Sequence, residues 1–247
     1  MRKQNWLPFI PVAAVILIWQ LLSMSAIIPP YMLPGPWQVT LAFACDFPLL
    51  MKHLLYTLTE AFTGLFLALA LSFILAIIMD ANSIIKQSVT PILLITQTMP
   101  VIAVAPLLIL WMGYGFAPKI TLVFLTCFFP VTIALLGAFA SADNDTLRLF
   151  QSMGAKKWQL YFYVKIPQGL PEFFSGLKIA ASYSIIGAVI AEWLGGDAGL
   201  GVYMIRVRRT YSFDKMFAVI LLVSALSLLL IKLVTLTEKK IMPWRKK

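Results

Sequence analysis

The sequence has few charged residues, one histidine and two cysteines. Charged side chains make up 12% of its 247 residues, and His53 belongs to no H-E-x-x-H pattern or Cys/His cluster. The sequence therefore suggests no metal site. Cys45 and Cys127 lie in different segments and indicate no disulfide framework. Because Cys127 lies within an apolar run, we expect it to be buried by packing.

Motifs of hydrolases and nucleotide-binding proteins are also missing. Neither G-x-S-x-G nor G-x-x-x-x-G-K-[ST] occurs in the chain. The glycine-rich stretch lies in a loop expected outside the cell, where no nucleotide would be found, and contains Gly195, Gly196, Gly199 and Gly201. We therefore predict a chain that is not an enzyme, has no catalytic residues and carries no cofactor of its own. If ATP drives it, a separate subunit must hydrolyse that ATP.

Apolar residues are abundant. They make up 61% of the sequence, and the mean hydropathy is +0.90, which is typical of a polytopic membrane protein. At 247 residues the chain is expected to form a single transmembrane domain, residues 1–247, in contact with membrane lipid. A net charge of +10 would suggest a nucleic-acid partner in a soluble protein. Here it follows from the bias of Lys and Arg toward cytoplasmic loops, and we expect no nucleic-acid partner.

Six apolar runs are each close to the ~20 residues that a bilayer-spanning helix needs. The run from Leu7 to Ile28 resembles a signal peptide, but it is longer than a usual signal and lacks a cleavage site, so we expect a retained helix. The segment from Trp37 to Leu50 reads as an amphipathic interfacial helix or as a plain loop. The sequence thus predicts an all-α polytopic membrane protein whose further spans are Leu54 to Met79, Val89 to Trp111, Ile120 to Ala140, Phe173 to Leu194 and Met216 to Leu236.

The distribution of basic residues predicts the orientation. With both termini in the cytoplasm, fourteen Lys and Arg residues lie on the inner side and six on the outer side, as the positive-inside rule requires. The six outer residues are Lys52, Lys119, Arg206, Arg208, Arg209 and Lys215. The inner residues are Arg2, Lys3, Lys86, Arg148, Lys156, Lys157, Lys165, Lys178, Lys232, Lys239, Lys240, Arg245, Lys246 and Lys247.

A polar stretch from Asp143 to Pro171 separates two of these spans. Its surface cannot lie in hydrocarbon, so we expect a cytoplasmic loop over residues 141–172. One short helix is predicted from Thr146 to Met153, with Gly154 supplying a left-handed turn, and a second from Ala155 to Ile166, which Pro167 should end. An ordered polar hairpin in a membrane protein indicates a docking surface for a cytoplasmic protein.

Two predicted helices carry small residues at every fourth position, which places them on one helix face. The ridges are Glu60, Gly64, Ala68, Ser72, Ala76 and Gly176, Ala180, Ser184, Ala188, Glu192. Close helix packing is one interpretation. The alternative is that Glu60, Ser184 and Glu192 line a polar pathway, because a carboxyl group at membrane depth is costly.

Proline kinks indicate a second candidate for the pathway. Pro91, Pro100 and Pro106 interrupt the third span, and the polar run Thr96, Gln97, Thr98 and Met99 directly precedes Pro100. These groups could contact a passing solute or form hydrogen bonds between helices. Arg206, Arg208 and Arg209 are expected outside the membrane, although Lys and Arg generally favour the cytoplasmic side. We therefore expect them to contact an acidic patch on a binding protein, an anionic solute or lipid headgroups.

The polar hairpin resembles the "EAA" loop of binding-protein-dependent ABC importer permeases. The matching residues are Met153-Gly154-Ala155, Trp158-Gln159-Leu160, Lys165-Ile166-Pro167 and Leu170-Pro171. The family's opening Glu-Ala-Ala falls here on Arg148-Leu149-Phe150, which departs from the pattern. The resemblance extends over nearly the whole chain and is strongest to the branch that imports taurine, alkanesulfonates, nitrate or pyrimidine precursors of thiamine. Within that branch, residues 173–196 most resemble the pyrimidine-precursor permeases.

The resemblance implies a bacterial inner-membrane permease that works as a homodimer. Its partners would be two ATPase subunits, which use ATP and Mg, and an extracytoplasmic solute-binding protein. The solute would be a pyrimidine precursor of thiamine, with a sulfonate, taurine or nitrate as the alternative. A secondary transporter is the more remote alternative function. The ATPase-coupling residues would be Arg148, Leu149, Phe150, Met153, Gly154, Ala155, Lys156, Lys157, Trp158 and Pro167.

Overall fold

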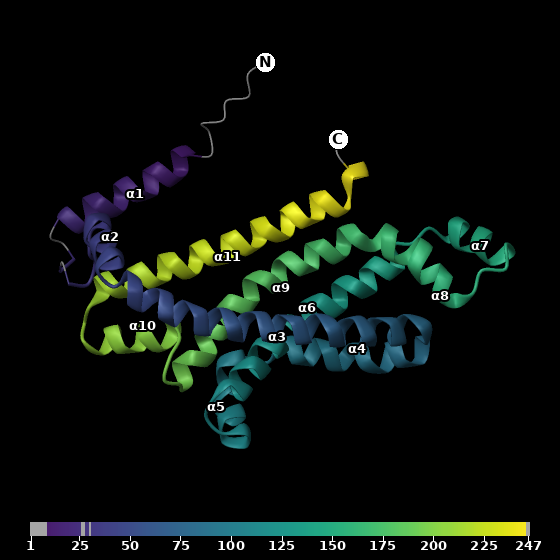
Figure 1. The fold of residues 1–247 in the computed structure, drawn as a ribbon, viewed down its shortest axis with the longest axis horizontal. Helices are drawn as coiled ribbons and strands as arrows, with labels where there is room; N and C mark the ends of the chain where they lie inside the picture. The colour runs from purple at the N-terminus through teal and green to yellow at the C-terminus, as the bar shows by residue number, and fades with distance from the viewer. Residues whose placement is uncertain (1–8, 26–27, 30, 246–247) are drawn as a thin grey trace, which may run out of the picture.

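The computed structural model describes residues 9–25, 28–29 and 31–245, and these residues form helices and no strand. The predictions for Arg2, Lys3, Lys246 and Lys247 lie outside the described residues. In the described part of the chain, four helical runs are long and apolar enough to cross a membrane (Figure 1). They are α3 (Phe47–Ala81), α6 (Phe116–Ala140), the run Lys157–Leu194 that ends in α9 (Ile166–Leu194), and α11 (Phe213–Ile241).

Shorter helices complete the fold. The bent pair α4 (Ser83–Thr98) and α5 (Val101–Met112) would form a fifth span, and α1 (Phe9–Met24) is a shorter apolar helix. The predicted all-helical membrane fold is therefore confirmed, and five of its six predicted spans correspond to α3, the α4–α5 pair, α6, α9 and α11. Helix α1 is a shorter helix within the remaining predicted span, of which residues 7–8 and 26–27 lie outside the described residues. The remaining elements are α2 (Pro36–Cys45), α7 (Asn144–Ser152), α8 (Lys157–Leu160), a π-helical turn (Tyr161–Lys165), α10 (Leu200–Arg209) and a 3₁₀ turn (Pro243–Arg245).

Helix α6 packs against both α3 and α9, and small residues let it approach them closely. A Cβ atom added to Gly64 of α3 would lie 2.6 Å from Val123 of α6. One added to Gly176 of α9 would lie 2.1 Å from the Cβ of Ala134 of α6. Every member of the two small-residue ridges is buried, so the ridges are packing surfaces.

The two ends of the bundle are called here the loop end, which contains α10, and the hairpin end, which contains α7 and α8 (Figure 1). At the loop end, α10 lies near the starts of α3 and α11, where Lys215 donates to Asp46 at 2.8 Å and the Tyr203 hydroxyl donates to the same carboxylate. At the hairpin end, α7 and α8 lie on the same side of the bundle as the turn from α3 to α4 (Figure 1). Ion pairs join Lys165 to Asp80 and Lys178 to Glu238 at this end.

Two elements differ from the sequence-based expectation. The third span is not one kinked helix, because α4 and α5 meet at 98° around Met99 and Pro100. Both residues have extended backbone angles, which the restriction on a residue before proline favours for Met99.

The prediction that Pro167 ends a helix was wrong. The chain stays helical from Lys157 to Leu194, and Pro167 lies in the first turn of α9. The preceding π-helical turn explains this, because the Ile166 N–H bonds to the Tyr161 carbonyl, five residues back. The wider turn accommodates the proline ring within the continuous helical run.

Candidate functional site

The polar hairpin consists of α7, a tight turn and α8. The Asp143 carboxylate caps α7 by accepting the backbone N–H of Thr146 at 3.0 Å and its hydroxyl at 2.6 Å. The hydrogen bond from the Thr146 side chain, followed by those from backbone N–H groups, holds the Asp143 pKa below its ordinary value. This end of the hairpin is therefore fixed by bonds within a few residues of sequence.

Gly154 makes the turn as predicted. Its φ is +81°, in the left-handed region that favours glycine. The Gly154 N–H donates to the Gln151 carbonyl at 2.9 Å, and the Ala155 N–H donates to the Phe150 carbonyl at 3.0 Å. These two bonds form a Schellman motif, which ends α7 sharply and turns the chain toward α8.

The hairpin exposes most of its side chains. Helix α7 buries none of its residues within the chain. Leu149, Met153 and Trp158 are large apolar side chains that are 58%, 75% and 57% exposed. Exposed apolar groups of this size on a structured polar hairpin are typical of a protein-binding surface. Of the other predicted coupling residues, Phe150 and Ala155 are half-buried, and the exposed ones are Arg148, Gly154, Lys156, Lys157 and Pro167.

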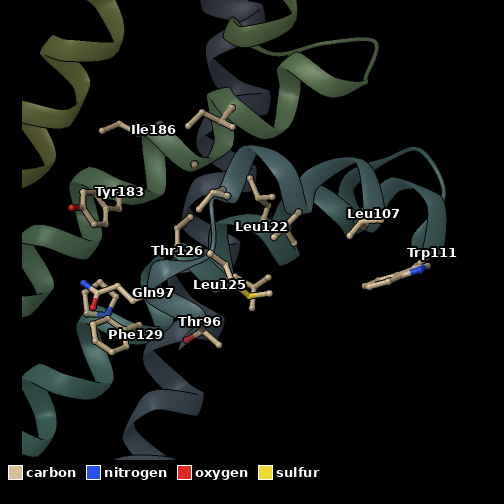
Figure 2. A pocket seen from close by; sticks show the side chains of 16 residues that line it. Thr96, Gln97, Leu107, Trp111, Leu122, Leu125, Thr126, Phe129, Tyr183 and Ile186 are labelled. Atoms are coloured by element: carbon tan, nitrogen blue, oxygen red, sulfur yellow. The ribbon is translucent and has the colours of Figure 1, made fainter. Parts of the chain in front are cut away.

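A cavity of about 500 Å³ lies among α4, α5, α6 and α9 (Figure 2). Three of the predicted pathway residues, Thr96, Gln97 and Met99, line it. Thr98 is exposed but is not part of the lining. The other lining residues are Val101, Val104, Leu107, Trp111, Leu122, Leu125, Thr126, Phe129, Pro130, Tyr183, Ile186, Gly187 and Ile190.

The lining of this cavity is neutral and mostly aliphatic, with three aromatic side chains, Trp111, Phe129 and Tyr183. Figure 2 shows the Gln97 amide close to Phe129, with Tyr183 on the same side and Trp111 at the far end. None of the described residues that line the cavity is Lys, Arg, Asp or Glu. The cavity can thus offer ring faces, an amide and hydroxyl groups to a solute.

Glu60, Ser184 and Glu192 do not line the cavity, which corrects the pathway interpretation of these three residues. Each is at most 1% exposed. Glu60 accepts a hydrogen bond from Lys119 at 2.8 Å, and the Ser184 hydroxyl donates to the carbonyl of Ala181. Packing of α3 and α9 against α6 removes these faces from any open space.

The Glu192 carboxylate has a structural role. It accepts hydrogen bonds from the Thr57 hydroxyl at 2.7 Å and from the Gly201 N–H at 2.6 Å. It thereby joins α3 to the glycine-rich loop, in which a Cβ atom on Gly199 would lie 2.1 Å from the Glu192 carboxyl. Sequence reasoning missed this loop contact and the burial of Lys119, which had been counted as an outer topology charge.

The three arginines of the loop end lie on α10. Arg206, Arg208 and Arg209 are all exposed in its last turns. Arg206 donates to the Asp197 carbonyl at 2.8 Å, which ties its guanidinium to the glycine-rich loop. In the residues that the structure describes, no group of three or more His, Cys, Asp or Glu side chains could hold a metal ion.

Residues 68–243 match the family of binding-protein-dependent transport system inner membrane components. The chain belongs to this family. It is therefore a permease, the membrane-embedded transport subunit of an ABC importer, and ATP hydrolysis is performed by a partner chain. The resemblance that the EAA-like hairpin indicated is confirmed.

Similar proteins agree with this assignment. The chain is 36% identical to the formylaminopyrimidine transport permease protein ThiX of Halalkalibacterium halodurans, over 94% of this chain and 93% of that protein. It is 28% identical to the taurine transport system permease protein TauC of Escherichia coli, over 99% and 91%. An inward-facing structure of the MetNI methionine ABC transporter has the same fold, with a TM-score of 0.71 and 18% identity over 79% of this chain and 97% of that chain.

Proposed function

We propose that this permease forms the membrane pathway for a pyrimidine precursor of thiamine. The observation that carries this proposal is the neutral lining of the cavity among α4, α5, α6 and α9, which combines an amide and hydroxyl groups with aromatic side chains. An aminopyrimidine is a flat, uncharged ring whose edge donates and accepts hydrogen bonds. We expect Gln97 and Thr96 to pair with that edge, while Phe129 covers a ring face. The ThiX relative, which is named for a formylaminopyrimidine, supports the same solute class.

The alternative solutes are sulfonates, taurine and nitrate, all of which carry an anionic group. An anion loses its hydration when it enters a membrane-embedded cavity, and a cationic side chain normally compensates for that loss. The described lining of the cavity contains no such side chain. This favours the neutral pyrimidine over the anionic alternatives.

The α7–α8 hairpin is the proposed docking element for the ATPase. Leu149, Met153 and Trp158 supply exposed apolar area, and Lys156 and Lys157 supply charge that orients the partner. We propose two ATPase subunits, which bind ATP and Mg, and two copies of this chain. Large exposed side chains of the cavity lining, such as Trp111 and Tyr183, would be covered by the second copy.

The proposed orientation in the bacterial inner membrane has both termini and the hairpin end in the cytoplasm. The loop end would then face the extracytoplasmic solute-binding protein. The exposed Arg206, Arg208 and Arg209 are proposed to contact an acidic surface of that protein.

Uptake into proteoliposomes tests the proposed solute. The permease, its ATPase and its binding protein would be reconstituted, and radiolabelled formylaminopyrimidine and taurine would be offered with ATP. We expect uptake of the pyrimidine and none of taurine. Gln97→Leu should lower pyrimidine uptake about tenfold, because one hydrogen bond contributes about 1.4 kcal/mol.

Thr98→Val is the matched control, since Thr98 is the next residue but does not line the cavity. It should retain near-normal uptake. Preferential uptake of taurine, or equal losses in the two variants, would contradict the proposed role of the cavity.

A further inference from the structure

Asp80, in the last turn of α3, contacts two residues of the π-helical turn that follows α8. The Tyr161 hydroxyl donates to Asp80 Oδ2 at 2.6 Å, and Lys165 Nζ donates to the same oxygen. The Lys165 ammonium also lies 4.9 Å from the centroid of the Tyr161 ring. One carboxylate therefore binds both ends of the turn that connects the hairpin to α9.

The contact of Asp80 with Tyr161 and Lys165, here called the Asp80 node, is partly shielded from solvent and is connected to the core by aromatic side chains. The side chains of Lys165 and Asp80 are 18% and 12% exposed, so their ion pair is less screened than one on the open surface. The Tyr161 ring packs edge-on against Phe139 of α6 at 5.5 Å, and Phe139 packs edge-on against Phe73 of α3 at 6.2 Å. Three helices of the bundle thus meet at the base of the hairpin.

The Asp80 node connects the hairpin to α3, a helix that neither directly precedes nor directly follows the hairpin in the chain. The covalent connections of the hairpin lead to α6 before it and to α9 after it. Helix α3 has no such connection, and Asp80 ties it to the hairpin through side chains. Beyond Asp80, the single residue Asn82 links α3 to α4, whose last residues Thr96 and Gln97 line the cavity.

We propose that Asp80 is a positioning residue through which movement of the hairpin is transmitted to α3 and α4. This inference rests on the proposed docking of the ATPase on α7 and α8. When ATP closes the two ATPase subunits and shifts the hairpin, the charge-assisted bonds to Asp80 make α3 and α4 follow α9. Without the carboxylate, α3 follows the hairpin only through its packing against α6 and α9, so the movement that reaches the Gln97 side of the cavity is smaller.

Spin labels on two helices test this inference without a transported solute. The background is Cys45→Ser, because Cys45 is exposed while Cys127 is fully buried. One label is placed by Ile92→Cys on α4 and another, in a separate protein, by Ile179→Cys on α9; these side chains are 59% and 49% exposed. In the complete transporter, the distance between the labels of the two copies is measured with and without Mg-ATP and vanadate.

Both labels should change their distance on nucleotide binding when Asp80 is present. In Asp80→Ala, the change at Ile179 should remain and the change at Ile92 should be clearly reduced, and Asp80→Glu should restore it. Glu238→Ala is the matched control, because it removes the carboxylate of the ion pair between α9 and α11 at the same end. It should leave both changes intact.

The outcomes separate this inference from the proposed function. A preserved change at Ile92 in Asp80→Ala, or its equal loss in Glu238→Ala, overturns the positioning role of Asp80. Met153→Asp tests the docking itself and should release the ATPase during size-exclusion chromatography. If Met153→Asp keeps the ATPase and neither label responds to nucleotide, the proposed docking is wrong.

Discussion

Asp46 illustrates how single residues fasten the loop end of the permease. Its carboxylate accepts hydrogen bonds from Lys215 of α11 and from Tyr203 of α10, so three segments meet at one group. The bond from Lys215, and then the bond from Tyr203, lower the Asp46 pKa below its ordinary value of 3.8. The same contact, after burial, raises the pKa of Tyr203, which therefore stays a donor.

The lowered pKa of Asp46 predicts a pH-dependent contribution to stability. The folded protein holds the ionised form more strongly than the unfolded chain does. The stabilisation is therefore complete above pH 3.8 and is lost as the pH falls toward the lower folded-state pKa. In thermal melts of the detergent-purified protein, Asp46→Asn should melt below the unaltered protein at neutral pH, and the difference should shrink in acid. A difference that stays constant with pH would contradict this.

At the residue scale, the sequence predicted which side chains are unusual but not what they contact. Gly154 could be assigned to a left-handed turn because the requirement is local, and its φ of +81° confirms it. Glu60 and Glu192 were recognised as costly groups at depth, yet their partners are distant in sequence. Lys119 lies 59 residues from Glu60, and Thr57 lies 135 residues from Glu192. Such pairs depend on how helices pack, which one sequence does not state.

Among the elements, the contact of α6 with α9 depends on a missing side chain. Gly176→Ala would place a Cβ atom 2.1 Å from that of Ala134, so the helices would have to separate. Overpacking of this kind costs about 1–3 kcal/mol. We expect Gly176→Ala to lower the melting temperature of the purified permease.

Gly137→Ala is the matched substitution on α6, because its added Cβ would have no neighbour within 4 Å. It should be neutral or raise stability by up to about 1 kcal/mol, since alanine favours a helix more than glycine does. Equal melting temperatures for the two variants would show that the close approach at Gly176 is not required.

The sequence pattern predicted the membrane-spanning helices better than it predicted the effect of proline within them. Helix-length apolar runs and small-residue ridges predicted the spans because their causes repeat along the chain. Proline was harder to interpret. Pro100 accompanies a 98° bend, whereas Pro167 lies inside a continuous helical run. The difference depends on the backbone before each proline, extended at Met99 and π-helical before Ile166, and that backbone responds to tertiary packing.

For the whole molecule, orientation is the property on which the proposals depend. Single-cysteine variants in the Cys45→Ser background test it with a membrane-impermeant maleimide. Arg208→Cys, at the loop end, should be labelled in intact cells whose outer membrane is permeable to the reagent. Lys156→Cys, in the hairpin, should be labelled only after the inner membrane is opened. Labelling of Lys156→Cys from outside would place the hairpin on the wrong side for an ATPase.

The high exposure of α7 has an evolutionary consequence. Because none of its side chains is fully buried within the chain, substitutions at its exposed positions should affect the folding of the permease little. Selection on these exposed side chains would then act mainly through binding to the ATPase. The surface of α7 and the ATPase surface that contacts it can therefore change together. A permease duplicated in a genome could in this way come to bind a different ATPase through substitutions in α7 and at exposed residues after it, such as Met153 and Trp158, while its solute pathway stays as it was.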